Sequence, residues 1–270
     1  MTMTTAEHRV SLRFAGVPTE SDPTPARLGL VSGFTLTSAC WGRFGERLAG
    51  AADLVPIDAP GHGHSADVDV DLWGGGAMVA DRLGRGDLLG YSLGGRLAQH
   101  AALSRPDAVE RLVLLSTTAG IADPAERAER RRSDEALATR LESIGVDAFV
   151  DEWTAQPMFA ALPSDPVCDA ARRSNTVEGL ARSLRRCGTG TQEPLWDRLA
   201  GIDIPTLVIA GGRDDKFAEL ARRLAAGIPG AELVIIAGAG HACHSERPDD
   251  TADAVLGWLR DSRRVAPSPS

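Results

Sequence analysis

Residues 86–104 read GDLLGYSLGGRLAQHAALS, and the order of features within this stretch decides the fold. An apolar run over 87–89 predicts a strand, and the apolar spacing over 93–103 predicts a helix. Between them, residues 90–94 follow the pattern G-x-S-x-G, which is typical of a sharp strand-to-helix turn that exposes a serine nucleophile. Side chains at Gly90 and Gly94 would collide with the neighbouring strand and helix. We therefore expect a reactive Ser92; the alternative is a glycine-rich turn with an idle serine.

Strand and helix patterns alternate along most of the chain on both sides of this stretch. Apolar runs predict further strands at 10–14, 28–31, 53–57, 111–115, 206–210 and 232–236. Helical patterns cover 41–48, 217–226 and 249–260. This alternation favours an α/β fold with a mostly parallel sheet that helices cover on both faces.

One segment, 123–192, breaks this alternation. It is helical in pattern, rich in Arg, Glu and Ala, interrupted by prolines, and has no convincing strand. We predict that it is a helical lid inserted into a core formed by 1–122 and 193–264. The remaining residues, 265–270, are expected to form a disordered tail.

The charge of the chain limits the partners to be expected. Its 270 residues include 37 acidic and 29 basic side chains, for a net charge of −8, which disfavours binding to a nucleic-acid backbone. No uncharged apolar run approaches the roughly 18–20 residues that span a bilayer, and the first residues lack the basic and apolar regions of a signal peptide. We expect a cytoplasmic protein with neither nucleic acid nor a membrane as partner.

The four cysteines, Cys40, Cys168, Cys187 and Cys243, are scattered without CxxC spacing. This spacing argues against a disulfide framework and a structural zinc site, so we predict free thiols. His241 and His244 form an HxxH pattern, but a metal site would need further ligands from elsewhere. We expect neither a metal nor a cofactor.

A serine nucleophile needs a histidine and an orienting carboxylate, and in this arrangement they follow in the order Ser, acid, His. Asp214 follows the strand predicted at 206–210, and His241 follows the strand predicted at 232–236. Both therefore lie just past the carboxyl ends of strands, where sites in open α/β sheets gather. We favour Asp214 over Asp215 and His241 over His244. The alternatives are a turn-capping aspartate and a surface histidine.

These features together resemble the α/β-hydrolase family over most of the chain. Besides the loops of Ser92, Asp214 and His241, the resemblance includes the turn Ser32-Gly33-Phe34 and the loop 60–65. It implies the α/β-hydrolase fold, with an oxyanion hole made by the backbone N–H groups of Phe34 and Leu93. Ser32 stands where the family usually has histidine.

A narrower resemblance comes from the predicted lid. Residues 153–160, 172–175 and 184–196 resemble the menaquinone-pathway lyases that form 2-succinyl-6-hydroxy-2,4-cyclohexadiene-1-carboxylate. The stretches 94–96 and 212–217 fit the same lyases, which take no cofactor. The lid usually diverges among hydrolases that share the triad, so this match is the more specific one.

The resemblance implies elimination of pyruvate from an enolpyruvyl ether, with no acyl-enzyme. Ser92 would be the base, activated by His241, which Asp214 orients. The small-molecule substrate is a polycarboxylate, and arginine suits carboxylate recognition. The carboxylate-binding arginines of these lyases carry over to Arg96, to Arg173 and to one arginine of the run 130–132, of which we favour Arg130. Tyr91 and Trp153 would line the pocket. For the three arginines the alternative is an ordinary ion pair or a solvated helix face.

Two other functions stay open at this point. The first is a hydrolase on the same triad, either a carboxylesterase or a carbon–carbon bond hydrolase. The second is a non-catalytic receptor that keeps the fold as a ligand pocket. The sequence does not distinguish a monomer from a homo-oligomer.

Overall fold

The computed structural model describes residues 26–265, so the strand predicted at 10–14 and residues 266–270 of the predicted tail lie outside the described residues. A six-stranded sheet runs through the centre, with the order β2-β1-β3-β4-β5-β6 and every neighbouring pair parallel. Its strands are β1 (Arg27–Val31), β2 (Asp53–Ile57), β3 (Gly86–Tyr91), β4 (Val109–Leu115), β5 (Thr206–Gly211) and β6 (Glu232–Ile236). The predicted parallel α/β fold is confirmed.

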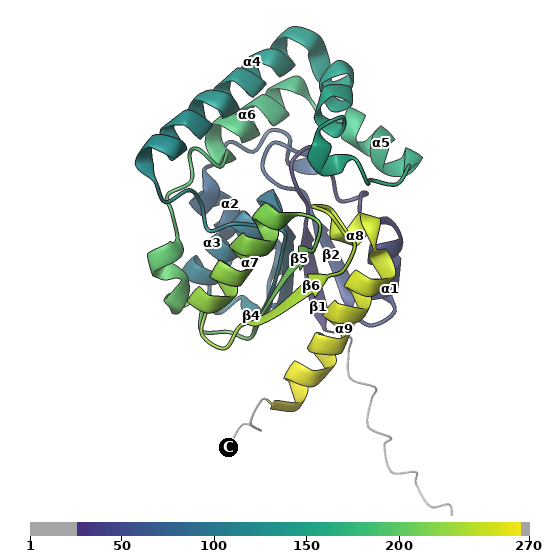
Figure 1. The fold of residues 1–270 in the computed structure, drawn as a ribbon, viewed down its shortest axis with the longest axis vertical. Helices are drawn as coiled ribbons and strands as arrows, with labels where there is room; N and C mark the ends of the chain where they lie inside the picture. Colours follow the sequence, from purple (N-terminus) through teal and green to yellow (C-terminus); the bar gives the residue numbers. More distant parts are fainter. Residues whose placement is uncertain (1–25, 266–270) are drawn as a thin grey trace, which may run out of the picture.

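Helices cover both faces of the sheet (Figure 1). One apolar core holds side chains such as Val79, Leu97 and Leu224, which come from α2 (Leu72–Leu83), α3 (Leu93–Ser104) and α7 (Asp215–Gly227). A second core includes side chains from α1 (Gly42–Ala49), α8 (Cys243–Glu246) and α9 (Pro248–Val265). All residues of β3 and β5 are buried, because both of their faces are covered.

Helix α2 is not among the predicted helices, and its composition explains why. Gly74, Gly75 and Gly76 weaken a helical pattern, since glycine is a poor helix former. The packing of α2 on α3 explains why glycines occupy these positions. A Cβ at Gly76 would meet the Ala101 backbone nitrogen at 2.7 Å, and one at Gly75 would meet the Leu97 side chain at 2.6 Å. Tertiary packing therefore outweighs local propensity in this helix.

The segment predicted as a lid is helical throughout its regular structure. It forms α4 (Pro124–Thr154), α5 (Pro166–Arg173) and α6 (Val177–Cys187), which lie together at one end of the sheet (Figure 1). Helix α4 breaks at Gly145, whose φ is 78°. Phe149, Leu141 and Leu180 are part of an apolar cluster shared by α4 and α6. The domain boundaries at 122 and 193 stay a prediction.

Short 3₁₀ turns complete the described part of the chain, at η1 (Gly63–Ser65), η2 (Pro157–Phe159) and η3 (Trp196–Gly201). Within residues 26–265, no helix is long and apolar enough to cross a membrane. The cytoplasmic location stays a prediction.

The cysteines differ from the prediction of four free thiols. Cys40 and Cys168 form a disulfide, whereas Cys187 and Cys243 are free and buried. The two bonded residues are 128 positions apart in the chain, so spacing gave no signal for the pair. The disulfide joins the loop after β1 to helix α5.

Three buried histidines make stability depend on pH. Burial lowers the pKa of His62 and of His100 to about 4, and that of His244 to about 3. Histidine in the unfolded chain titrates near pH 6.5. Between about pH 6.5 and 4 the unfolded state therefore binds more protons than the folded state. We therefore expect the free energy of unfolding to decrease as the pH is lowered from 6.5 to 4, by up to about 1.4 kcal/mol per pH unit for each histidine.

Urea unfolding at intervals from pH 7.5 to 4.5 measures this slope. His100→Gln removes one of the three groups and should flatten it. A free energy of unfolding that is constant across the window would show that these histidines take up protons in the folded chain as readily as in the unfolded chain.

Candidate active site

The turn between β3 and α3 leaves no space for side chains at its two glycines. A Cβ at Gly90 would lie 2.3 Å from the Gly94 carbonyl oxygen, and one at Gly94 would lie 1.9 Å from the Val31 carbonyl oxygen. Ser92 itself has φ of 53°, in the left-handed region that non-glycine residues rarely adopt. The sheet and the helix hold Ser92 in this conformation at the carboxyl end of β3.

The side chains of Ser92, His241 and Asp214 form a hydrogen-bonded chain at this edge of the sheet. His241 Nε2 is 3.3 Å from Ser92 Oγ, and His241 Nδ1 is 3.0 Å from Asp214 Oδ2. Asp214 also caps α7 by accepting the Phe217 N–H at 3.1 Å. Burial works to raise the pKa of Asp214, but the hydrogen bonds from His241 and Phe217 outweigh it and hold that pKa below its ordinary value. The carboxylate is therefore charged and able to orient an imidazole.

The neighbouring candidates, Asp215 and His244, have other surroundings. Asp215 is the exposed first residue of α7. His244 is 2% exposed and packs its ring 4.3 Å from the ring of Tyr91, and its Nδ1 has no hydrogen-bond partner among the described residues. Between residues 26 and 265, no group of three or more His, Cys, Asp or Glu side chains could hold a metal ion.

The residues expected to form the oxyanion hole border the same cavity as Ser92. Phe34 lies in a turn closed by the Leu36 N–H, which donates to the Gly33 carbonyl at 3.1 Å. Leu93 is the first residue of α3, where helix N–H groups are free of intrahelical partners. Phe34, Leu93 and Ser92 all line a cavity of about 320 Å³.

Three arginines from three helices face this cavity. They are Arg96 from α3, Arg130 from α4 and Arg172 from α5. Tyr91 and Trp153 also line it, and Trp153 packs its ring 5.0 Å from that of Phe34. A pocket that joins a serine–histidine pair to several guanidinium groups is suited to an anionic ligand.

The sequence matches the Alpha/beta hydrolase family over residues 30–254. The chain belongs to this family. Among its curated relatives, 2-succinyl-6-hydroxy-2,4-cyclohexadiene-1-carboxylate synthase of Salmonella typhimurium is 32% identical over 246 residues, covering 88% of this chain and 95% of that protein. A Bacillus subtilis relative to which the same activity is provisionally assigned is 36% identical over 231 residues, covering 80% and 84%.

Two solved structures are similar to this chain over most of its length. MenH from S. aureus superimposes with a TM-score of 0.83 at 31% identity, over 90% of this chain and 96% of that one. A thermophilic esterase from Thermogutta terrifontis, solved with malate bound, superimposes with a TM-score of 0.72 at 25% identity, over 88% and 90%.

Within this hydrolase-family site, Arg96 and Arg130 differ in their surroundings. Arg96 is 7% exposed, and burial lowers its pKa to about 10, so the side chain is still cationic at neutral pH. It donates to the Cys187 carbonyl at 2.7 Å. Arg130 is more open and donates to the buried Asp134 at 2.7 Å. Of the run 130–132, only Arg130 borders the cavity.

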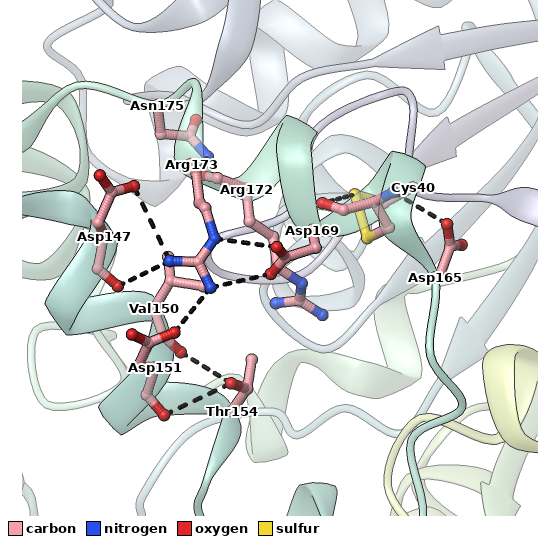
Figure 2. A network of polar contacts seen from close by, with 11 residues as sticks. Cys40, Asp147, Val150, Asp151, Thr154, Asp165, Asp169, Arg172, Arg173 and Asn175 are labelled. Carbon is pink, nitrogen blue, oxygen red and sulfur yellow. Dashed lines mark hydrogen bonds and ion pairs between the residues drawn. A yellow bond between two sulfur atoms is a disulfide. The ribbon is translucent and has the colours of Figure 1, made fainter.

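Arg173 lies outside the cavity, which corrects its predicted place at the substrate. Figure 2 shows its guanidinium turned toward carboxylates of α4 and α5. It donates to Asp169 at 2.9 Å and to Asp151 at 2.7 Å. Successive helical residues point about 100° apart, so its neighbour Arg172 takes the inward position, 8% exposed. Arg173 joins α4 and α5 instead.

Lys216 is a cavity residue that sequence reasoning did not single out as functional. It is the only lysine in the chain, beside 28 arginines. A lysine kept where every other basic residue is arginine is a signal that could have been used.

The steric constraint at the turn generates a stability prediction. Gly94→Ala should destabilise this hydrolase fold by about 2 kcal/mol or more, since the new methyl must displace the backbone of β1. Gly257→Ala in α9 is the matched control, because a Cβ there meets nothing within 4 Å. It should be neutral or stabilising by roughly 0.5–1 kcal/mol. Chemical denaturation measures both, and an equal effect of the two would contradict the constraint.

Proposed function

We propose that this chain is a lyase of menaquinone biosynthesis. It would eliminate pyruvate from 2-succinyl-5-enolpyruvyl-6-hydroxy-3-cyclohexene-1-carboxylate and leave 2-succinyl-6-hydroxy-2,4-cyclohexadiene-1-carboxylate. The synthase names of the relatives support this reaction. The observation that carries it is the convergence of Arg96, Arg130 and Arg172 on the cavity that contains Ser92 and His241.

The proposed chemistry is a proton transfer followed by an elimination. Ser92 Oγ takes a proton from the carbon beside the succinyl ketone while its own proton passes to His241 Nε2. Asp214 stabilises the imidazolium that forms. The ketone oxygen becomes an enolate, which accepts hydrogen bonds from the backbone N–H groups of Phe34 and Leu93. Collapse of the enolate forms a new ring double bond, shifts the existing one, and breaks the bond between the ring carbon and the ether oxygen. Pyruvate leaves as its enolate and takes up the proton that His241 holds.

The arginines would bind the carboxylates of this substrate. A guanidinium can donate two parallel hydrogen bonds to one carboxylate, which fixes orientation as well as affinity. Arg96 and Arg172 are both buried, so ion pairs with them are little screened by solvent. Tyr91 and Trp153 would supply the apolar walls against the ring, and Lys216 adds a cation at the exposed side.

A serine esterase is the second candidate, because the triad and the fold suit acyl transfer equally well. The likeness to the Thermogutta terrifontis esterase supports it. Arg96 and Arg172 count against an esterase for neutral lipophilic substrates, since an uncharged ligand would leave these two buried cations without a carboxylate partner.

The contrast between two adjacent arginines tests the substrate assignment. Arg172→Ala should lower kcat/KM for the enolpyruvyl substrate by roughly 30-fold or more, because it removes a desolvated carboxylate contact. Arg173→Ala is the matched control and should change kcat/KM by less than about threefold, although it loosens the lid. Steady-state pyruvate release measures both. Equal losses in the two variants would overturn the assignment of Arg172.

The second test separates a lyase from a hydrolase. We expect stoichiometric pyruvate release from the enolpyruvyl substrate, no covalent adduct on Ser92 by intact-protein mass spectrometry, and slow cleavage of p-nitrophenyl esters. Ser92→Ala should lower pyruvate release by a factor on the order of 10³. A substrate-derived adduct on Ser92, or fast ester cleavage without pyruvate, would establish the hydrolase instead.

A further inference from the structure

Thr35 holds an unusual backbone conformation beside the oxyanion donor Phe34. It is the third residue of the turn closed by the Leu36 N–H and the Gly33 carbonyl, and its φ is 67°. Turns of this kind favour glycine or asparagine at that position, and a β-branched residue there is strained. The conformation therefore depends on contacts from outside the turn.

Three groups outside the turn hold Thr35. Its N–H donates to His62 Nε2 at 3.1 Å. Its hydroxyl accepts from Arg172 Nη1 at 2.6 Å, and its carbonyl accepts from Asn175 Nδ2 at 2.9 Å. Two of these three groups come from the lid, at the end of α5 and just beyond it.

Asn175 uses both the nitrogen and the oxygen of its side-chain amide in this network. Besides Thr35, Nδ2 donates to the Arg172 carbonyl at 2.9 Å, and Oδ1 accepts the Gly63 N–H at 2.9 Å. The side chain is buried, lies just past the end of α5 (Figure 2), and is not among the residues that line the cavity. The disulfide between Cys40 and Cys168 joins the same helix to the loop that follows the turn.

We infer that Asn175 is a positioning residue that holds the oxyanion turn in its reactive conformation. The inference rests on the proposed function, because it takes the Phe34 N–H as an oxyanion donor. Such donors are effective only when fixed about 2.7–3.1 Å from the oxygen that becomes charged. Without Asn175, Thr35 can relax toward negative φ, and that relaxation moves the adjoining Phe34 peptide. The lid helix α5 is thereby part of the catalytic scaffold rather than only a cover.

The first experiment compares Asn175→Ala with Ser174→Ala. Ser174 is the exposed neighbour, and its hydroxyl donates to the Ala171 carbonyl within α5 at 2.8 Å. Asn175→Ala should lower kcat for pyruvate release by about 10- to 100-fold, with KM changed less than about threefold, since Asn175 does not line the cavity. Ser174→Ala should leave both parameters unchanged. Should Asn175→Ala fail to fold, Asn175→Asp replaces it, because Asp keeps the size and the acceptor for Gly63.

A second measurement distinguishes positioning from general destabilisation. In a Thr35→Gly background the turn adopts positive φ without strain, so Asn175→Ala should then cost less than about threefold in kcat. An equal loss in both backgrounds, or a loss that appears in KM alone, would overturn the inference.

A third measurement is independent of the proposed substrate. Diisopropyl fluorophosphate reacts with an activated serine by forming an oxygen–phosphorus bond and expelling fluoride, while the serine proton passes to His241. The rate of this reaction depends on the oxyanion donors. Mass spectrometry should show labelling of Ser92 slowed at least tenfold by Asn175→Ala and unchanged by Ser174→Ala. Slowed labelling in a chain that releases no pyruvate would uphold the inference and reject the lyase function. Labelling and pyruvate release that are both unaffected by Asn175→Ala would reject the inference.

Discussion

The close approach of helix α3 to strand β1 is the constraint on which the rest of the site depends. At Gly94 a single methyl group would lie 1.9 Å from the Val31 carbonyl oxygen. Because the helix starts so near the sheet, Ser92 is held at the carboxyl end of β3 next to the turn that follows β1. Parallel pairing brings the ends of β5 and β6 to the same edge, and with them Asp214 and His241. The reactive groups meet through backbone geometry, before any substrate contributes.

The charges of this protein would act on an anionic ligand in opposite ways at long and at short range. The net charge of −8 repels an anionic ligand at a distance. Inside the cavity, Arg96 and Arg172 are shielded from water, and the attraction between a guanidinium and a carboxylate is correspondingly stronger. Desolvation lowers the pKa of Arg96 only to about 10, so it keeps its charge at neutral pH. Selectivity for a carboxylate ligand would therefore arise from contact rather than from steering.

Much of this arrangement could be predicted from the sequence, because strand-end loops carry local signals. The G-x-S-x-G turn, Asp214 and His241 each follow a recognisable apolar strand. Local patterns could not supply the orientation of side chains within the segment predicted as a lid. Arg172 and Arg173 are consecutive residues of α5. Only the packing of this helix decides which of the two side chains faces the cavity. The bond between Cys40 and Cys168 and the use of Gly75 and Gly76 in helix packing are likewise long-range facts that spacing does not encode.

Helix α5 contacts both the cavity and the turn that contains Phe34, through Arg172. One Nη group of Arg172 donates to Thr35, and a guanidinium has further N–H donors available for a carboxylate. A substrate held by Arg172 would thus engage the same side chain that restrains the turn carrying the Phe34 N–H. Binding energy from a carboxylate remote from the reacting carbon can then be used to hold the donor where charge develops, which raises kcat rather than merely lowering KM. An esterase for neutral substrates has no use for such a connection, whereas an enzyme that must enolise a polycarboxylate does.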